Sequence, residues 1–106
     1  MSPPPKLTLS VLAVLDVLQE STIDNPAWGL QICEITGLGS GTVYPILDRF
    51  AKAGWVSSWD EAEPHPGRPA RRYWAMSAAG LEATKQALDA RCQRQALRLR
   101  TAPGAL

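Results

Sequence analysis

Hydrophobic residues near the N-terminus recur at the spacing of an amphipathic helix. Leu12, Leu15 and Leu18 supply the main buried stripe of a first helix, which is predicted over Leu9–Glu20. Valines on the other sides of the same segment make it apolar almost all round, which indicates that two of its faces are covered. This pattern is the first indication of a partner subunit.

Two shorter helices joined by a tight turn are predicted next. A polar loop over Ser21–Pro26 leads to the first of them, with Pro26 suited to its first turn, and this helix ends near Thr36. Gly37 lies where the chain turns sharply, because glycine readily adopts the positive φ that such a turn needs. Cys33 is expected to be a small core residue near the point where the helices cross.

The third helix is predicted to begin at a Ser40 cap, to run to about Ala53 and to stop at Gly54. Its apolar residues follow the i, i+3, i+4, i+7 pattern of a face turned to the core. These residues are Val43, Ile46, Leu47 and Phe50. Two short helices crossing at a glycine turn form a helix-turn-helix, which presents its second helix to the major groove of DNA.

Two strands are predicted after the third helix, over Trp55–Asp60 and Arg71–Met76. The segment between them, Glu61–Ala70, is too long and too rich in proline for a tight hairpin, so a protruding loop is expected. Two strands and such a loop directly after a helix-turn-helix make a winged helix.

Ser77 is predicted to cap a long final helix. Four residues near one side of this helix have a spacing close to that of a coiled-coil seam. They are Leu81, Leu88, Cys92 and Leu99. A helix so exposed is marginal alone, so it is expected to pack against a partner. The predicted fold is mainly α with a small β-wing, a winged helix-turn-helix plus a long C-terminal dimerisation helix.

On this pattern the chain divides into a winged-helix DNA-binding domain over residues 7–76 and a dimerisation helix over residues 77–100. Disordered ends are expected at residues 1–6 and 101–106. A length of 106 residues suits one small domain with a modest core. No apolar run approaches a membrane span and the N-terminus lacks the layout of a signal peptide, so a cytoplasmic protein without a membrane partner is expected.

Two cysteines and one histidine provide neither a disulfide framework nor a metal-ligand set, and no cofactor is predicted. The sequence pairs no nucleophile with a base and has no phosphate-binding loop, so the protein is not expected to be an enzyme.

Charge is distributed unevenly along the chain, although the net charge is only +1. Residues 1–63 hold three basic and eight acidic residues, whereas residues 64–106 hold eight basic and two acidic residues. This asymmetry indicates an anionic partner. The alternative is that the arginines of the final helix only solvate it. These arginines are Arg91, Arg94, Arg98 and Arg100.

The outward face of the third helix carries the first group of candidate DNA-binding residues. Ser40, Thr42 and Tyr44 can donate hydrogen bonds to phosphates or base edges. Arg49 and Lys52 can neutralise charge on the DNA backbone. Two alternatives stay open: Tyr44 packs against the first helix or the wing, and Lys52 only pairs with Asp48 at i, i+4.

The predicted wing carries the second group, in a loop stiffened by Pro64, Pro66 and Pro69. Arginine on a protruding loop suits the narrow minor groove or its flanking phosphates. The candidates are Arg68 and Arg72, beside Arg71 and His65. Strand alternation places Arg71 with Tyr73 on one face and Arg72 with Trp74 on the other. The alternative is that the loop is only a solvated connector.

These residues make the chain resemble the PadR-like family of bacterial winged-helix transcriptional regulators. The resemblance is carried by GLQICEITGLGSGTVYPILDRFAKAGWV and PHPGRPARRYWAMSAAG, which fall within Gly29–Gly80 and span about half of the chain. It implies a homodimer built from the final and N-terminal helices, which binds a two-fold operator and usually represses. It also implies that Ser40, Thr42 and Tyr44 are recognition-helix contacts and that Arg68 is a wing contact.

The prediction is therefore a sequence-specific DNA-binding transcriptional regulator, a repressor that binds a palindromic operator as a homodimer. Dimerisation is assigned to Leu12, Leu15, Leu81, Leu88, Cys92 and Leu99. A small-molecule effector is compatible with this interpretation, and the sequence does not identify one. The alternative is a winged-helix protein-interaction module without specific DNA binding, which would not need the basic residues Arg68 and Arg72.

Overall fold

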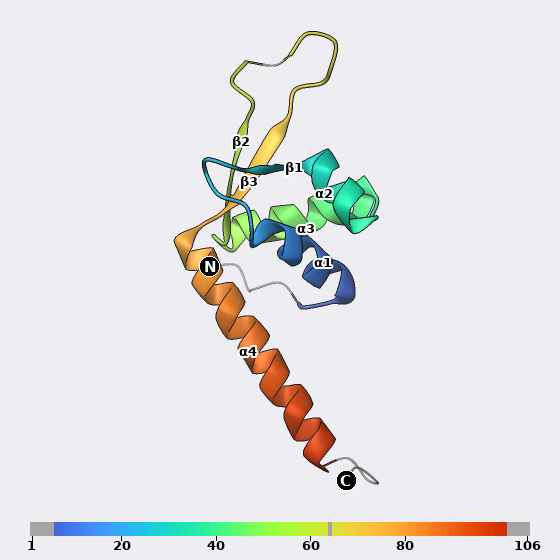
Figure 1. The fold of residues 1–106 in the computed structure, drawn as a ribbon, viewed down its shortest axis with the longest axis vertical. Coiled ribbons are helices and arrows are strands. Elements are labelled where there is room, and N and C mark those ends of the chain that lie inside the picture. Colours follow the sequence, from blue (N-terminus) through green and yellow to red (C-terminus); the bar gives the residue numbers. More distant parts are fainter. Residues whose placement is uncertain (1–5, 64, 102–106) are drawn as a thin grey trace.

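The computed structural model describes residues 6–63 and 65–101, in which four helices and a three-stranded antiparallel sheet are found (Figure 1). In chain order the elements are α1 (Leu9–Leu18), β1 (Ala27–Trp28), α2 (Gly29–Thr36), α3 (Ser40–Lys52), β2 (Val56–Asp60), β3 (Arg72–Met76) and α4 (Ala78–Thr101). Helices α1 to α3 and the sheet form the body, and α4 leaves it as a long arm, so the molecule measures 61 × 27 × 23 Å. The predicted winged helix-turn-helix with a long C-terminal helix is confirmed.

Several predicted features fall outside the described residues. They are Pro64 and most of the two ends expected to be disordered, residues 1–5 and 102–106. The side chain of Arg100 is likewise outside them. Thr101, which was assigned to the disordered tail, is instead the last residue of α4.

Helix α1 buries one face, spaced i, i+3, i+4, i+7, against the rest of the body. The buried residues are Val11, Val14, Leu15 and Leu18. Leu12 lies on the flank and is only partly buried, so its place in the main stripe was predicted wrongly. The helix also ends at Leu18 rather than Glu20, because Ser21 draws the chain toward β3. The Ser21 hydroxyl donates to the Leu18 carbonyl (2.6 Å) and accepts from the backbone N–H of Met76 (3.1 Å).

The prediction that the second helix begins around Pro26 was wrong, because a third strand intervenes. Ala27 and Trp28 form β1, which pairs with β3 in the register Ala27↔Trp74 and Trp28↔Tyr73. Helix α2 therefore begins at Gly29. A strand of two residues is too short to show the alternation by which strands are recognised in a sequence.

The turn between α2 and α3 follows the prediction at Gly37, whose φ is +75° and whose N–H donates to the carbonyl of Cys33 (2.9 Å). The predicted cap of α3 was wrong: Gly39 is the N-cap, with extended backbone, and Ser40 is the first helical residue. At the other end Ala53 is the C-cap and Gly54 has a φ of +78°, as the expected stop requires.

The core lies between the three short helices and one face of the sheet. The four residues of α3 predicted to face inward are all buried. The stacked rings of Phe50 and Trp55, with centroids 5.3 Å apart, join the end of α3 to the start of β2. Cys33 packs against this core, as expected. In the sheet β3 is the central strand, and β2 pairs with it from Val56↔Met76 to Asp60↔Arg72.

Helix α4 starts with the predicted Ser77 cap, whose hydroxyl accepts from the N–H of Gly80 (2.9 Å). Gly80 lies close to the connection between α3 and β2, where a Cβ at this position would overlap the backbone carbonyl of Trp55. The first turns of α4 pack on the body through Ala83, Thr84 and Ala87, and the distal half projects away from it.

Candidate nucleic-acid interface

The outward face of α3 is open to solvent along its whole length. Burial of the four inward residues leaves an exposed polar face on the other side, as the helical pattern predicted. The exposed residues are Ser40, Gly41, Thr42, Tyr44, Pro45, Asp48, Arg49 and Lys52. All five sequence-predicted site residues of this helix are therefore exposed to solvent.

Tyr44 differs from the other exposed residues because its ring is held by the wing. The ring packs edge-on against that of Trp74, with centroids 5.8 Å apart, and the residue remains 39% exposed. The hydroxyl end of Tyr44 lies against Gly29 at the start of α2, where a Cβ would overlap it. The ring of Tyr44 therefore packs against the wing, which was one of the alternatives left open by the sequence. A DNA contact by its hydroxyl stays a prediction.

The charges on α3 are partly balanced within the helix. The Lys52 ammonium lies 2.9 Å from the Asp48 carboxylate, which is the i, i+4 pair considered above. Both side chains are well exposed, so the pair stabilises the helix by only a few tenths of a kcal/mol. Arg49 has no ion-pair partner among the residues that the structure describes.

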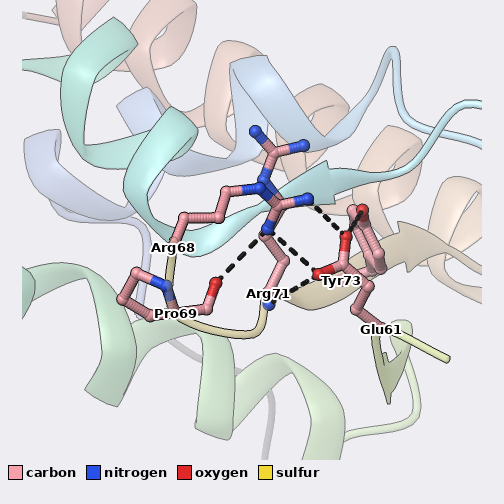
Figure 2. Close-up of polar contacts among 5 residues, drawn as sticks. All are labelled: Glu61, Arg68, Pro69, Arg71 and Tyr73. Carbon is pink, nitrogen blue, oxygen red and sulfur yellow. Dashed lines mark hydrogen bonds and ion pairs between the residues drawn. The ribbon is translucent and has the colours of Figure 1, made fainter. Parts of the chain in front are cut away.

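The wing loop is closed at its base by one carboxylate, that of Glu61, which follows directly after β2 (Figure 2). The Arg68 guanidinium donates to both of its oxygens, at 3.0 Å to Oε1 and 2.7 Å to Oε2. The Tyr73 hydroxyl donates to Oε2 (3.1 Å) and the backbone N–H of Arg71 donates to Oε1 (3.5 Å). Glu61, the first residue of the loop, is therefore bonded to Arg68 and Arg71 near the far end of the loop and to Tyr73 in β3.

These donors hold the pKa of Glu61 well below its usual 4.5, at about 2. The hydrogen bonds from Arg68 are the largest cause, and those from Tyr73 and the Arg71 backbone add to it, whereas burial acts in the opposite direction. The pKa of Arg68 is raised, chiefly by the same bonds. Glu61 is 10% and Arg68 27% exposed at the side chain, so the pair is enclosed by the wing rather than solvated.

Arg71 directly precedes β3 and Arg72 is its first residue, and their side chains lie on opposite sides of the strand, as alternation predicted. Arg72 pairs with Asp60 (3.0 Å), donates to the Ser58 hydroxyl (3.1 Å) and lies over the ring of Trp74. The Arg71 guanidinium lies 4.0 Å from the ring centroid of Trp28. That geometry is a cation–π contact, which leaves its positive charge without a balancing acid.

A groove of about 440 Å³ separates the base of the wing from α2 and α3. Its walls include Trp28 of β1, Glu34 of α2, Tyr44 of α3, and Arg71 and Arg72 of the wing. The groove therefore connects the outward face of α3 with the arginines of the wing.

Two residues of this surface, Glu61 and Trp28, were not predicted from the sequence. Alternation carried past Asp60 puts Glu61 on the same face as Tyr73, and that was an available signal for their contact. Trp28 could not be placed without β1, because its position beside Tyr73 depends on that strand.

The six residues assigned to dimerisation differ in their exposure. Leu15 is 1% exposed within its own subunit, so its assignment to a subunit interface is corrected: it is a core residue. Leu12, Leu15 and Leu88 line a groove of about 370 Å³ between α1 and α4, together with Asp16. Leu81, Cys92 and Leu99 are exposed along α4.

The described part of the chain has no helix long and apolar enough to cross a membrane. Within residues 6–63 and 65–101, no three or more His, Cys, Asp or Glu residues are grouped so that they could hold a metal ion.

Residues 14–86 match the model of a family described as the transcriptional regulator PadR-like family. Among solved structures, the transcriptional regulator PA4135 is similar at 16% identity with a TM-score of 0.61, over 91% of this chain and 66% of that one. This chain thus spans just under two thirds of the length of PA4135.

Two further structures have the same fold. The PadR-like transcriptional regulator BC4206 from Bacillus cereus is 19% identical with a TM-score of 0.61, over 91% of this chain and 92% of its own. The S. aureus MepR–DNA complex is 14% identical with a TM-score of 0.60, over 89% of this chain and 74% of its own. No curated protein matches the chain.

Proposed function

Because the chain belongs to the PadR-like family of transcriptional regulators, we propose that it binds double-stranded DNA sequence-specifically as a homodimer and represses transcription from a palindromic operator. Residues 7–76 are the DNA-binding domain and α4 is the dimerisation helix. A cytoplasmic location follows from that role.

The observation that carries the proposal is the open polar face of α3 beside a protruding wing. Helix α3 inserts this face into the major groove, where Ser40, Thr42 and Tyr44 donate to base edges or phosphates. Arg49 and Lys52 lie further along the same face and neutralise phosphates. The wing lies over the flanking backbone, with Arg72 at its base. That MepR was crystallised with DNA supports such a use of this fold.

Dimerisation is supported by the apolar side chains that α4 leaves uncovered. Leu99 is 70% exposed and Leu81 39% exposed, and Cys92 lies between them on the helix. Leu12 and Leu88 line the groove between α1 and α4, which a second copy can fill. Leu15 also lines this groove, but it is 1% exposed and belongs to the core of its own subunit.

The first test is a selection of genomic DNA fragments by the purified protein at physiological salt, followed by sequencing. The expected result is a palindromic motif with half-sites about 34 Å apart, or a multiple of this distance. A variant with Ser40→Ala and Thr42→Val loses the motif, because it lacks both hydroxyl donors. Gln93→Ala, on an exposed position of α4, recovers the wild-type motif. Recovery of fragments without a shared motif would favour the protein-interaction module instead.

The second test addresses the dimer by analytical ultracentrifugation. Leu99→Asp places a charge in the proposed interface and is expected to shift the protein to a monomer. Ile23→Asp is the matched control, because Ile23 is 65% exposed in the connection between α1 and α2, and this variant stays a dimer. A dimer that is unaffected by Leu99→Asp would remove distal α4 from the interface.

A further inference from the structure

The three arginines of the wing look alike in the sequence, but only two of them have an acidic partner. Arg68 pairs with Glu61 and Arg72 pairs with Asp60. Arg71 lies over the ring of Trp28 and has no ion-pair partner among the described residues. An arginine whose charge is already neutralised by a carboxylate must give up that bond before it can bind a phosphate.

The cost of this exchange differs between Arg68 and Arg72. Arg68 makes two charge-assisted bonds to Glu61, and its Nη1 also donates to the carbonyl of Pro69 (3.3 Å). Both partners are largely enclosed, at 27% and 10% side-chain exposure. The Arg72–Asp60 pair is exposed at 51% and 74%, so water and salt screen it. Arg68 is therefore the least available cation of the wing.

Arg71 is in the opposite situation, because its surroundings fix its position without cancelling its charge. Its backbone is bonded twice to Glu61 across the base of the loop: its N–H donates to Glu61 Oε1, and its carbonyl accepts from the N–H of Glu61 (2.8 Å). Its guanidinium rests on Trp28, which is itself fixed by pairing with Tyr73. The side chain lines the groove that leads to Tyr44 on α3.

We propose that Arg71, presented on Trp28, is the phosphate-binding cation of the wing, and that Glu61 is a positioning residue that neutralises Arg68 and fixes the backbone of Arg71. The groove between the wing and α3 then receives a phosphodiester of the DNA backbone at its wing wall, where Arg71 and Arg72 together outweigh the single carboxylate of Glu34 on the α2 wall. Arg68 closes the loop and does not contact DNA. This inference rests on the proposed DNA binding and replaces its expected wing contact.

The experiment measures the salt dependence of binding to the tightest duplex found by the fragment selection. Arg71→Gln removes one phosphate contact, so it weakens binding and lowers the slope of log K against log salt by about 0.9 per subunit. Arg98→Gln is the matched control, because it removes the same charge from an exposed position on α4 and leaves the slope unchanged. The inference is overturned if the two variants behave alike.

Two further variants test the role of Glu61 through the direction in which they change the salt dependence of binding. Glu61→Gln releases the charge of Arg68 and is expected to steepen the salt dependence, whereas a purely structural loss would flatten it. The double variant Glu61→Gln/Arg68→Gln keeps the net charge and replaces the ion pair by neutral amides, so it retains the wild-type slope. A double variant that loses as much slope as Arg71→Gln, when Glu61→Gln alone does not, would identify Arg68 as the phosphate contact and overturn the proposal.

The outcomes of these tests can still be told apart if a substitution disturbs the wing. Arg71→Gln leaves the backbone bonds between residues 61 and 71 in place, so this variant tests the proposal even if the double variant unfolds the loop. Circular dichroism and the dimer mass check that each variant is folded. Wild-type protein that binds no motif at all would contradict the proposed function itself, whereas motif binding unaffected by Arg71→Gln contradicts only this inference.

Discussion

Helix α3 and the wing are neighbouring parts of one surface, yet they are held in place by different forces. Helix α3 is positioned by four buried apolar side chains, an interaction without direction that many similar residues satisfy. The wing loop is positioned by directional bonds that converge on the carboxylate of Glu61. The helix can therefore vary its outer face freely, whereas the wing cannot change its acid without changing the environment of its arginines.

The largest effect is expected on the helix side, where Phe50→Ala removes part of the apolar packing that positions α3. Phe50 is fully buried and stacked on Trp55, so the variant leaves a cavity and loses about 3–5 kcal/mol of unfolding free energy. Urea denaturation measures the loss. Lys52→Ala is the control, because its exposed pair with Asp48 contributes only a few tenths of a kcal/mol. Equal stability of the two variants would show that α3 does not depend on burial.

The same difference explains what could be predicted from the sequence. Periodicity identified all four buried residues of α3, because a helical period repeats over many positions. Gly37, Gly54 and Ser77 were also placed correctly, since turn and cap chemistry is local. The bonds of Glu61 to Arg68 span seven residues along an irregular loop, and no period describes its path.

The errors have related physical causes. β1 was missed because it has only two residues and owes its existence to pairing with β3. Leu12 and Leu15 were predicted to share one buried stripe of α1 and also to lie in the dimer interface. The rotation of α1 about its axis instead buries Leu15 and leaves Leu12 at the flank. That rotation is set by tertiary packing, which a segment apolar on every side does not specify.

A second prediction concerns Tyr44, which joins the two regions. In Gly29→Ala the new Cβ overlaps the end of the Tyr44 side chain, so the ring must move away from Trp74. The overlap is with a side-chain end rather than backbone, so the expected loss of stability is about 1 kcal/mol or less. DNA affinity falls several-fold, because the helix and the wing are no longer joined.

Ring-proton NMR of Trp74 and DNA titration measure these two effects of Gly29→Ala. Gly41→Ala is the control for stability, because a Cβ at this exposed helical position meets no atom within 4 Å, and alanine there is expected to stabilise α3. An unchanged Trp74 environment in Gly29→Ala would contradict the coupling.

The last prediction concerns the pKa of Glu61, which tests the wing side directly. Because the titration occurs at acid pH, its effect on the protein at neutral pH is the smallest of those considered. In the folded protein the pKa of Glu61 is about 2, below the ordinary 4.5. The ionised carboxylate therefore stabilises the fold fully at pH values above 4.5. That stabilisation is lost as the pH falls through the folded pKa. Carboxyl-carbon NMR measures the pKa. Arg68→Gln moves it upward more than Tyr73→Phe does, because the bonds from Arg68 are the larger cause. An order reversed between these variants would mean that Tyr73, rather than Arg68, closes the loop on Glu61, and Arg68 would then be free to bind phosphate.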